Sequence, residues 1–200
     1  MVFPHASNKP GPSIRSGDFA ELLISDFLEH FHGFWVPRYK YGDKASPNES
    51  VKGSDVLGFH QLKPGTPSLK DTLVVCEVKA KLTGKKYNDR LGIAVRDSSK
   101  DIGHLRLATS LNALKRRALI GKMPDKVATV ARFQRKTDAQ FILKSAAAAV
   151  LTENLFDASA VSAVDCSTHA NANNLDLIVI KGPQLMDLAH ILYKTAADEA

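Results

Sequence analysis

The sequence predicts an α/β fold in which a central mixed β-sheet is flanked by helices. Residues 71–82 alternate between two sides with a period of two, which is the period of a β-strand. Residues 16–33 carry apolar side chains at steps of three and four, which is the period of an α-helix. Further strand-like and helix-like segments follow as far as the C-terminus. This mixture is typical of a protein whose helices pack on a sheet.

Composition limits the class of protein. The chain has 200 residues, of which 44% are apolar and 24% charged, as in a soluble globular domain with a full core. There is no run of about 18 apolar residues and no secretion signal, so neither a membrane span nor export is expected. Cys76 and Cys166 have no metal-binding spacing and lie in segments predicted to be strands. We therefore expect reduced, buried thiols in a cytoplasmic protein.

The net charge of +6 is concentrated in the middle of the chain. Residues 91–135 hold 10 basic and 3 acidic side chains, whereas residues 136–200 hold 4 basic and 8 acidic ones. Residues 1–90 are closer to balance, with 13 basic and 10 acidic side chains. A basic segment of this kind suits a phosphate polyanion, although solvated helix faces are often basic too.

The N-terminus is expected to be a flexible arm over residues 1–16, followed by a single domain over residues 17–200. Three prolines in residues 1–13 favour the arm. A helix capped by Ser16 or Asp18 follows and ends at Gly33. Glu21 lies near its start, where the helix dipole by itself favours a carboxylate.

Residues 34–41 predict a strand that a proline interrupts, so it is expected at a sheet edge. Arg38 and Lys40 alternate there with Tyr39 and Tyr41. Basic and aromatic side chains together suit nucleic acid. Packing in the core is the alternative role of the aromatic rings.

The next two predicted strands hold the acidic candidates. Asp55 begins a short strand-like run, and residues 63–67 predict the turn that leads into the strand over residues 71–82. In that strand Glu77 and Lys79 fall on the same side, with their Cβ atoms about 6 to 7 Å apart. Simple solvation of an exposed strand face is the common explanation for an isolated pair of this kind.

Residues 84–90 predict a basic loop directly after this strand. Lys81, Lys85, Lys86 and Arg90 are placed to meet a phosphate backbone near the acidic candidates. Lysines in a loop are also frequently no more than solvated, and this alternative stays open.

The second half of the chain is expected to continue with helices and strands. Residues 124–136 are compatible with either a strand or a helical turn. The other expected elements are a helix capped at Asp97 and ending near Gly121, a helix over residues 137–156, strands over residues 161–166 and 175–180, and a last helix after Pro183.

Asp55 and, 22 positions later, Glu77-Val78-Lys79 resemble the Asp…(Asp/Glu)-x-Lys signature of the PD-(D/E)XK nuclease superfamily. The proline of the name is absent, since Ser54 precedes Asp55. The resemblance implies a restriction-endonuclease-like fold with an α-β-β-β-α-β core. It also implies metal-dependent hydrolysis of phosphodiester bonds.

The same resemblance implies a role for each residue. Asp55 and Glu77, with the backbone carbonyl of Val78, would hold Mg²⁺ (or Mn²⁺) in a shell of oxygen ligands. Lys79 would orient the attacking water and stabilise the transition state. Glu21 would approach the metal or its water, as first-helix glutamates do in many members of the superfamily.

Residues 53–79, the helix from Ile102 and residues 177–183 are similar to the nuclease subunit of Hachiman-type anti-phage defence. That similarity implies DNA as the substrate and a helicase subunit as the partner. Two other classes stay open, namely a catalytically silent nuclease-like fold and a basic scaffold that binds nucleic acid or a protein without cleaving. Sequence reasoning does not separate DNA from RNA, or a monomer from an oligomer.

Overall fold

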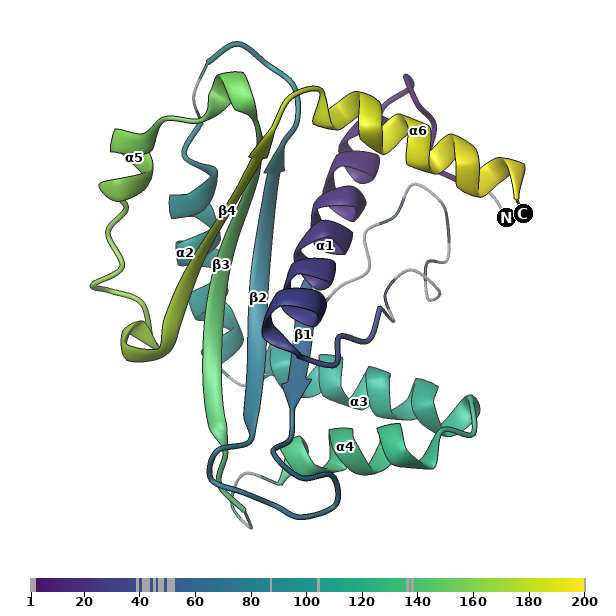
Figure 1. The fold of residues 1–200 in the computed structure, drawn as a ribbon, viewed down its shortest axis with the longest axis vertical. Coiled ribbons are helices and arrows are strands. Elements are labelled where there is room, and N and C mark those ends of the chain that lie inside the picture. Colours follow the sequence, from purple (N-terminus) through teal and green to yellow (C-terminus); the bar gives the residue numbers. More distant parts are fainter. Residues whose placement is uncertain are drawn as a thin grey trace.

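A four-stranded β-sheet forms the centre of the protein, in the strand order β1-β2-β3-β4 (Figure 1). β1 (Val56–His60) and β2 (Thr72–Lys81) are antiparallel. β3 (Ile142–Thr152) is parallel to β2, and β4 (Leu175–Gly182) is parallel to β3. The sheet is therefore mixed, as predicted. The computed structural model describes residues 3–38, 40, 44, 46, 49, 53–86, 88–103, 105–135, 137 and 139–199.

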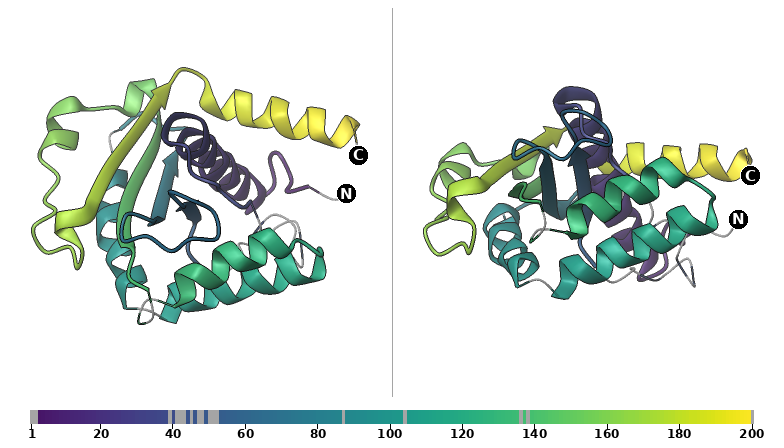
Figure 2. Two further views of the ribbon diagram at one scale, coloured as in Figure 1. Left: turned by 60° about the horizontal axis from the view of Figure 1, so that its bottom comes forward. Right: turned by 90° about the horizontal axis from the view of Figure 1, so that it is seen from below.

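Helices cover both faces of this sheet (Figures 1 and 2). One face carries α1 (Gly11–His32), and α6 (Leu185–Asp198) packs beside it. The other face carries α2 (Arg90–Ile102) and the adjacent pair α3 (Leu105–Ile120) and α4 (Pro124–Gln134). The connection from β3 to β4 contains η2 (Glu153–Leu155), α5 (Ala158–Ser162) and η3 (Ala172–Asn174).

The alternation along β2 separates two hydrophobic cores, as the period of two predicted. Val74, Cys76 and Val78 pack in one core with residues of α1. Leu73 and Val75 pack in another with residues of α3 and α4. Glu77 and Lys79 share the side of Leu73 and Val75, because side chains two positions apart point the same way. The strand therefore presents these two polar side chains toward α2 and α3.

The alanine-rich stretch belongs to strand β3, so the helix expected over residues 137–156 was wrong. Residues 146–149 pair with β2 on one side and with β4 on the other. All four alanines are 0% exposed, because α1 covers one face of β3 and α2 the other. A strand buried on both faces has no alternation to reveal it, and alanine by itself favours a helix.

Two further expectations in the second half were also wrong. Residues 161–166 are not a strand, because Asp157 accepts a hydrogen bond from the backbone N–H of Ala160 and caps α5. Asp97 is no helix cap but lies inside α2, which Asp89 caps through the backbone N–H of Gly92. Residues 124–134, left open by the sequence, form α4. The strand β4 and the last helix α6 are confirmed.

Differences near the N-terminus have simple physical reasons. α1 begins at Gly11 rather than at Ser16 or Asp18, because a proline in the first turn of a helix breaks no hydrogen bond. The strand expected over residues 34–41 is reduced to one bridge between Trp35 and Phe59. Tyr39 and Tyr41 lie outside the described residues.

Helices α1 and α6 bring two distant parts of the chain together. The hydroxyl of Tyr193 in α6 donates a hydrogen bond to Asp18 in α1 at 2.5 Å. The guanidinium of Arg15 lies 4.6 Å from the centre of the Tyr193 ring and 3.3 Å from Nδ1 of His190. These contacts fix the N-terminal half of α1, which carries Glu21 one turn further on.

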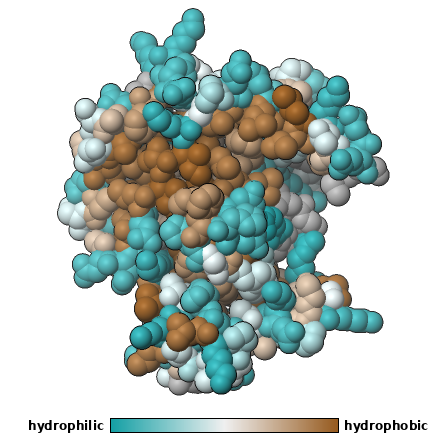
Figure 3. Space-filling model, in the orientation of Figure 1, coloured by the Kyte–Doolittle hydropathy of each residue, from teal (hydrophilic) through white to brown (hydrophobic). Residues whose placement is uncertain are grey.

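Apolar surface gathers on the face that carries α1, over the region where β4, α1 and α6 lie (Figure 3). β4 is an edge strand, and α1 covers its neighbours more completely than it covers β4 itself. A groove of about 370 Å³ lies there and is lined by residues that include Phe27, Phe34 and Ile178. Among the described residues, no helix has the length and apolar character needed to cross a membrane.

Candidate active site

The site lies at an open edge of strand β2. β1 pairs with Thr72 to Cys76, and among the described residues no strand pairs with β2 on that side from Glu77 onward. Asp55, directly before β1, reaches this edge, and its Oδ2 accepts a hydrogen bond from the backbone N–H of Val78 at 2.9 Å. The N–H and C=O groups of one strand residue point to the same side. The carbonyl of Val78 therefore faces the edge that Asp55 occupies.

Glu77 and Lys79 contact each other, as their spacing predicted. Lys79 Nζ lies 2.7 Å from Oε1 of Glu77 and 2.8 Å from Oδ2 of Asp97 in α2. Burial opposes the ammonium charge, but hydrogen bonds to Asp97 and Glu77 outweigh it and raise the pKa of Lys79. Glu77 is 3% exposed, whereas a quarter of the Lys79 side chain is open to solvent. The lysine thus stays charged beside a buried carboxylate.

Arg106 in α3 joins Glu77 to Asp55. Its Nη2 lies 2.9 Å from Oε2 of Glu77 and 3.7 Å from Oδ1 of Asp55. The same guanidinium donates two hydrogen bonds to the carbonyl of Gly53, at 2.7 and 2.9 Å. The two carboxylates that the sequence singled out therefore approach one point from two segments of the chain.

Lys40 links Asp55 to Glu21. Its Nζ lies 3.1 Å from Oδ1 of Asp55 and 3.5 Å from Oε2 of Glu21, and Lys40 is only 5% exposed. Sequence reasoning placed Lys40 on a surface for nucleic acid, but its ammonium lies among buried carboxylates. Burial, followed by the negative charge of Asp55, raises the pKa of Glu21 to about 8. Glu21 is thus mainly protonated at neutral pH.

One carboxylate oxygen of Glu77, Oε2, is a candidate metal ligand. Oε2 is buried and accepts no hydrogen bond, because Arg106 is close to it but not aligned to donate. Burial and the charge of Asp55 raise the pKa of Glu77, against the opposing effects of Lys79 and Arg106. A buried carboxylate oxygen needs a donor or a cation beside it, and here the Arg106 guanidinium supplies the positive charge at 2.9 Å. Together with Asp55 and the Val78 carbonyl, Oε2 fits the oxygen ligands that Mg²⁺ prefers.

The carboxylates of Glu21, Asp55 and Glu77 are too far apart in this structure to form one compact set of metal ligands. The ligand atoms of Glu21, Asp55 and Glu77 do not all lie within 4.8 Å of one another. Lys40 lies between the first two and Arg106 between the last two. Basic side chains therefore occupy positions from which they balance the carboxylates.

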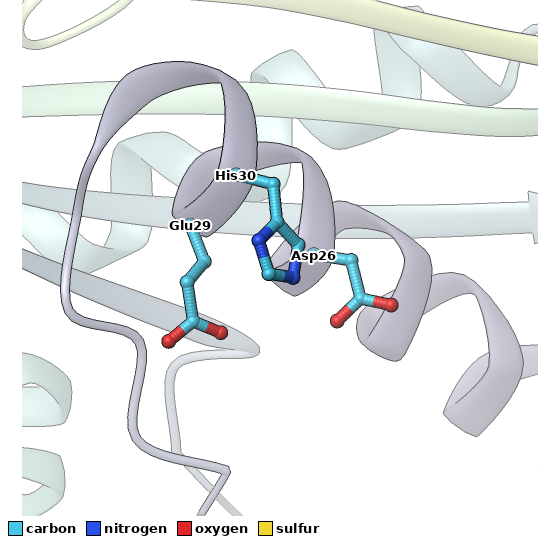
Figure 4. Close-up of side chains that lie close together, drawn as sticks. All are labelled: Asp26, Glu29 and His30. Atoms are coloured by element: carbon cyan, nitrogen blue, oxygen red, sulfur yellow. The ribbon is translucent and has the colours of Figure 1, made fainter.

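The compact group of possible ligands in the described residues lies elsewhere, on α1. Asp26, Glu29 and His30 project to the same side of the helix near its end (Figure 4). Arg38 forms ion pairs with both carboxylates, at 2.5 Å to Asp26 and 2.7 Å to Glu29. Arg38, predicted to meet nucleic acid, lies after α1 and is thus engaged by two carboxylates of that helix, and these pairs account for the acidic group.

The remaining basic candidates lie at the end of β2 and beyond it. Lys85 and Lys86 are exposed in the loop between β2 and α2, and Lys81 is half-buried in the last position of β2. Arg90 is the first residue of α2. A role of these four side chains in binding nucleic acid stays a prediction.

Sequence reasoning missed three contributors, namely Asp97, Asp101 and Arg106. Asp101 is buried, and its Oδ1 accepts a hydrogen bond from the hydroxyl of Ser54 at 2.7 Å, which helps to fix Asp55. Asp97 and Asp101 are one helical turn apart, so they lie on one face of α2. That spacing was the available signal, but two acidic residues one turn apart are common on helices.

The fold and the site define an α/β protein whose mixed sheet carries buried carboxylates and basic side chains at an open strand edge. Of the known protein families, HamA matches residues 2–196. The chain belongs to the HamA family, protein A of the Hachiman anti-phage system, and HamA proteins work in that system alongside the HamB helicase. No curated protein matches the chain. The resemblance to the Hachiman subunit is thereby confirmed at the level of the family.

Proposed function

We propose that this protein is a divalent-metal-dependent nuclease that cleaves DNA. One observation carries the proposal: Asp55 and Glu77 approach the same guanidinium nitrogen, while Glu77 is bonded to Lys79. Two carboxylates and a lysine at one point are the groups that metal-assisted hydrolysis of a phosphodiester requires. The buried Oε2 of Glu77, which accepts no hydrogen bond, supports a cation at this point.

Three oxygen donors at the edge of β2 fit Mg²⁺ or Mn²⁺. They are the carboxylates of Asp55 and Glu77 and the backbone carbonyl of Val78. The bound ion would lower the pKa of a water molecule and offset the charge on the phosphate oxygens. The chain itself fixes its ligands: the N–H of Val78 holds Asp55, and Lys79 holds Glu77.

Lys79 and Glu21 have separate roles in this proposal. Lys79 stays protonated through Asp97 and Glu77, so it supplies a fixed positive charge beside the metal ligands. Such a charge stabilises negative charge that develops on a phosphate in the transition state. Glu21 has its pKa raised to about 8, so it can take up or release a proton near neutral pH.

DNA is the proposed substrate, and a helicase of the HamB kind is the proposed partner. The basic segment over residues 91–135 and the exposed Lys85 and Lys86 supply positive charge, and Arg106 of that segment reaches the site. The HamA family belongs to a defence against phages and works alongside a helicase. The order α1, β1, β2, three helices (α2, α3 and α4) and then β3 supports a restriction-endonuclease-like core, with the bridge at Trp35 in place of a third early strand.

The decisive experiment is cleavage of supercoiled, linear and single-stranded DNA with and without Mg²⁺, by the protein alone and with its helicase partner. Glu77→Gln and Lys79→Ala should each abolish metal-dependent cleavage. Glu153→Gln, which changes an exposed glutamate in η2, is the matched control and should leave cleavage unchanged. DNA that is retained but never cut by the unaltered protein would instead indicate a binding module.

A further inference from the structure

Arg106 is held in the site by the backbone as well as by carboxylates, and its Nε also lies 3.6 Å from Oδ1 of Asp101. It lies in the first turn of α3, and its Nε and Nη2 both donate to the carbonyl of Gly53, two residues before Asp55. Its side chain is 28% exposed, so the guanidinium borders solvent on one side. A two-point anchor of this kind fixes where the positive charge lies.

The anchored guanidinium lies where a metal ion would have to bind. Nη2 is 2.9 Å from Oε2 of Glu77 and 3.7 Å from Oδ1 of Asp55. Mg²⁺ holds its oxygen ligands at about 2.0 to 2.1 Å. The ion and the guanidinium would therefore use the same oxygens and repel each other at short range. The contact of Arg106 with Oε2 is a close ion pair, and a cation at the same oxygen would have to share it with the guanidinium.

We propose that Arg106 is an internal counter-ion of the Asp55 and Glu77 carboxylates that competes with the divalent cation for them. Together with Lys40 and Lys79, it balances the two carboxylates while no cation is bound, and its anchored charge opposes a cation at the same oxygens. Arg106 thereby sets the cation concentration at which the site fills. This inference rests on the proposed nuclease function, because the cation in question is the one that the nuclease would use.

A purely structural role for Arg106 predicts the opposite result. If the arginine only anchors the chain at Gly53, its removal displaces Asp55 and weakens metal binding. If it competes with the cation, its removal leaves the two carboxylates with only Lys40 and Lys79 as counter-ions, which lowers the stability of the metal-free protein and strengthens metal binding. The direction of the change in affinity therefore separates the two roles.

The test is a direct titration of the full-length protein with Mn²⁺, followed by electron paramagnetic resonance, with thermal melting measured alongside. Arg106→Met should lower the dissociation constant for Mn²⁺ by about tenfold or more, since one nearby like charge is removed. Without metal, Arg106→Met should also melt at a lower temperature than the unaltered protein. Added Mg²⁺ should raise the melting temperature of the variant more than that of the unaltered protein. Arg106→Lys keeps a charge but loses the fork of donors. Its dissociation constant for Mn²⁺ should lie between those of Arg106→Met and the unaltered protein.

The matched control is Arg116→Met, which removes an exposed charge from the same helix and should leave the affinity unchanged. Equal or weaker Mn²⁺ binding by Arg106→Met overturns the competition. If Arg106→Met does not fold, Arg106→Lys takes its place, and Mn²⁺ binding no tighter than that of the unaltered protein overturns the competition. Loss of Mn²⁺ binding in Glu77→Gln shows that Glu77 holds the metal ion, whatever the result for Arg106→Met. Unchanged binding in Glu77→Gln overturns the nuclease site and this inference together.

Discussion

The carboxylate of Asp55 satisfies the backbone N–H of Val78, the bond that a longer strand β1 would otherwise make. A side chain thus completes the sheet at the point where the site lies. Asp55 is consequently both a structural acceptor and a candidate metal ligand. The two roles can be separated by substitutions that keep or remove the acceptor.

Asp55→Asn should retain more stability than Asp55→Ala, because an amide oxygen can still accept from Val78. The difference in the free energy of unfolding is expected to be about 1 to 3 kcal/mol, the cost of a buried donor without a partner. Urea denaturation measures it. Both variants should lose Mn²⁺ binding to the same degree, and an asparagine variant that binds as tightly as aspartate would contradict the ligand role.

Glu21 gives the metal-free protein a pH dependence of definite sign. Its pKa is raised from 4.5 to about 8 in the folded state, so the folded protein binds the proton more tightly than the unfolded chain. The contribution of Glu21 to stability is therefore full below pH 4.5 and is lost as the pH rises toward 8. Urea denaturation at several pH values should show a shallower decline for Glu21→Gln. An identical decline in both proteins would contradict the raised pKa.

Ala147 is expected to tolerate no larger side chain. It is 0% exposed in β3 and packs against Ala94 and Val95 of α2. Ala147→Leu should lower the free energy of unfolding by about 1 to 3 kcal/mol, because the extra volume forces α2 away from the sheet. Ala160→Leu, in the short helix α5 outside the cores, serves as the control. Equal stability of the two variants would show that α2 is not closely packed here.

Lys85 and Lys86 provide a test of the surface beside the site. Replacing both by alanine should weaken DNA binding and reduce the slope of log affinity against log salt by up to about 0.9 for each lost phosphate contact. Fluorescence anisotropy at several salt concentrations measures this slope. Lys194→Ala, in α6, is the control. An unchanged slope would mean that these two lysines remain in solvent when DNA is bound.

Local patterns predicted the part of the site that lies on a single strand. Glu77 and Lys79 are two residues apart, and the period of a strand alone makes them point the same way. The contacts of Arg106 and Lys40 depend instead on how α3 and the segment before β1 pack against β2. No spacing in the sequence encodes that packing, so both side chains were missed or misplaced.

The strands that were predicted correctly have one polar side. The strand that was missed, β3, has no polar side. β2 and β4 were found, but β3 was taken for a helix because its four alanines favour helices and carry no alternation. Tertiary packing decided the matter, since only small side chains allow α1 and α2 to approach the same strand from its two faces. The same long-range dependence explains why the residues before Cys166 were wrongly assigned.

The hydrogen bond between Asp18 and Tyr193 joins residues 175 positions apart in the sequence. During translation the N-terminal helix leaves the ribosome first, and part of its surface has nothing to pack on until the final helix emerges. Glu21 lies on that first helix, close to Asp18. Any chemistry that requires this glutamate at its observed place therefore depends on α6 having been synthesised and packed against α1.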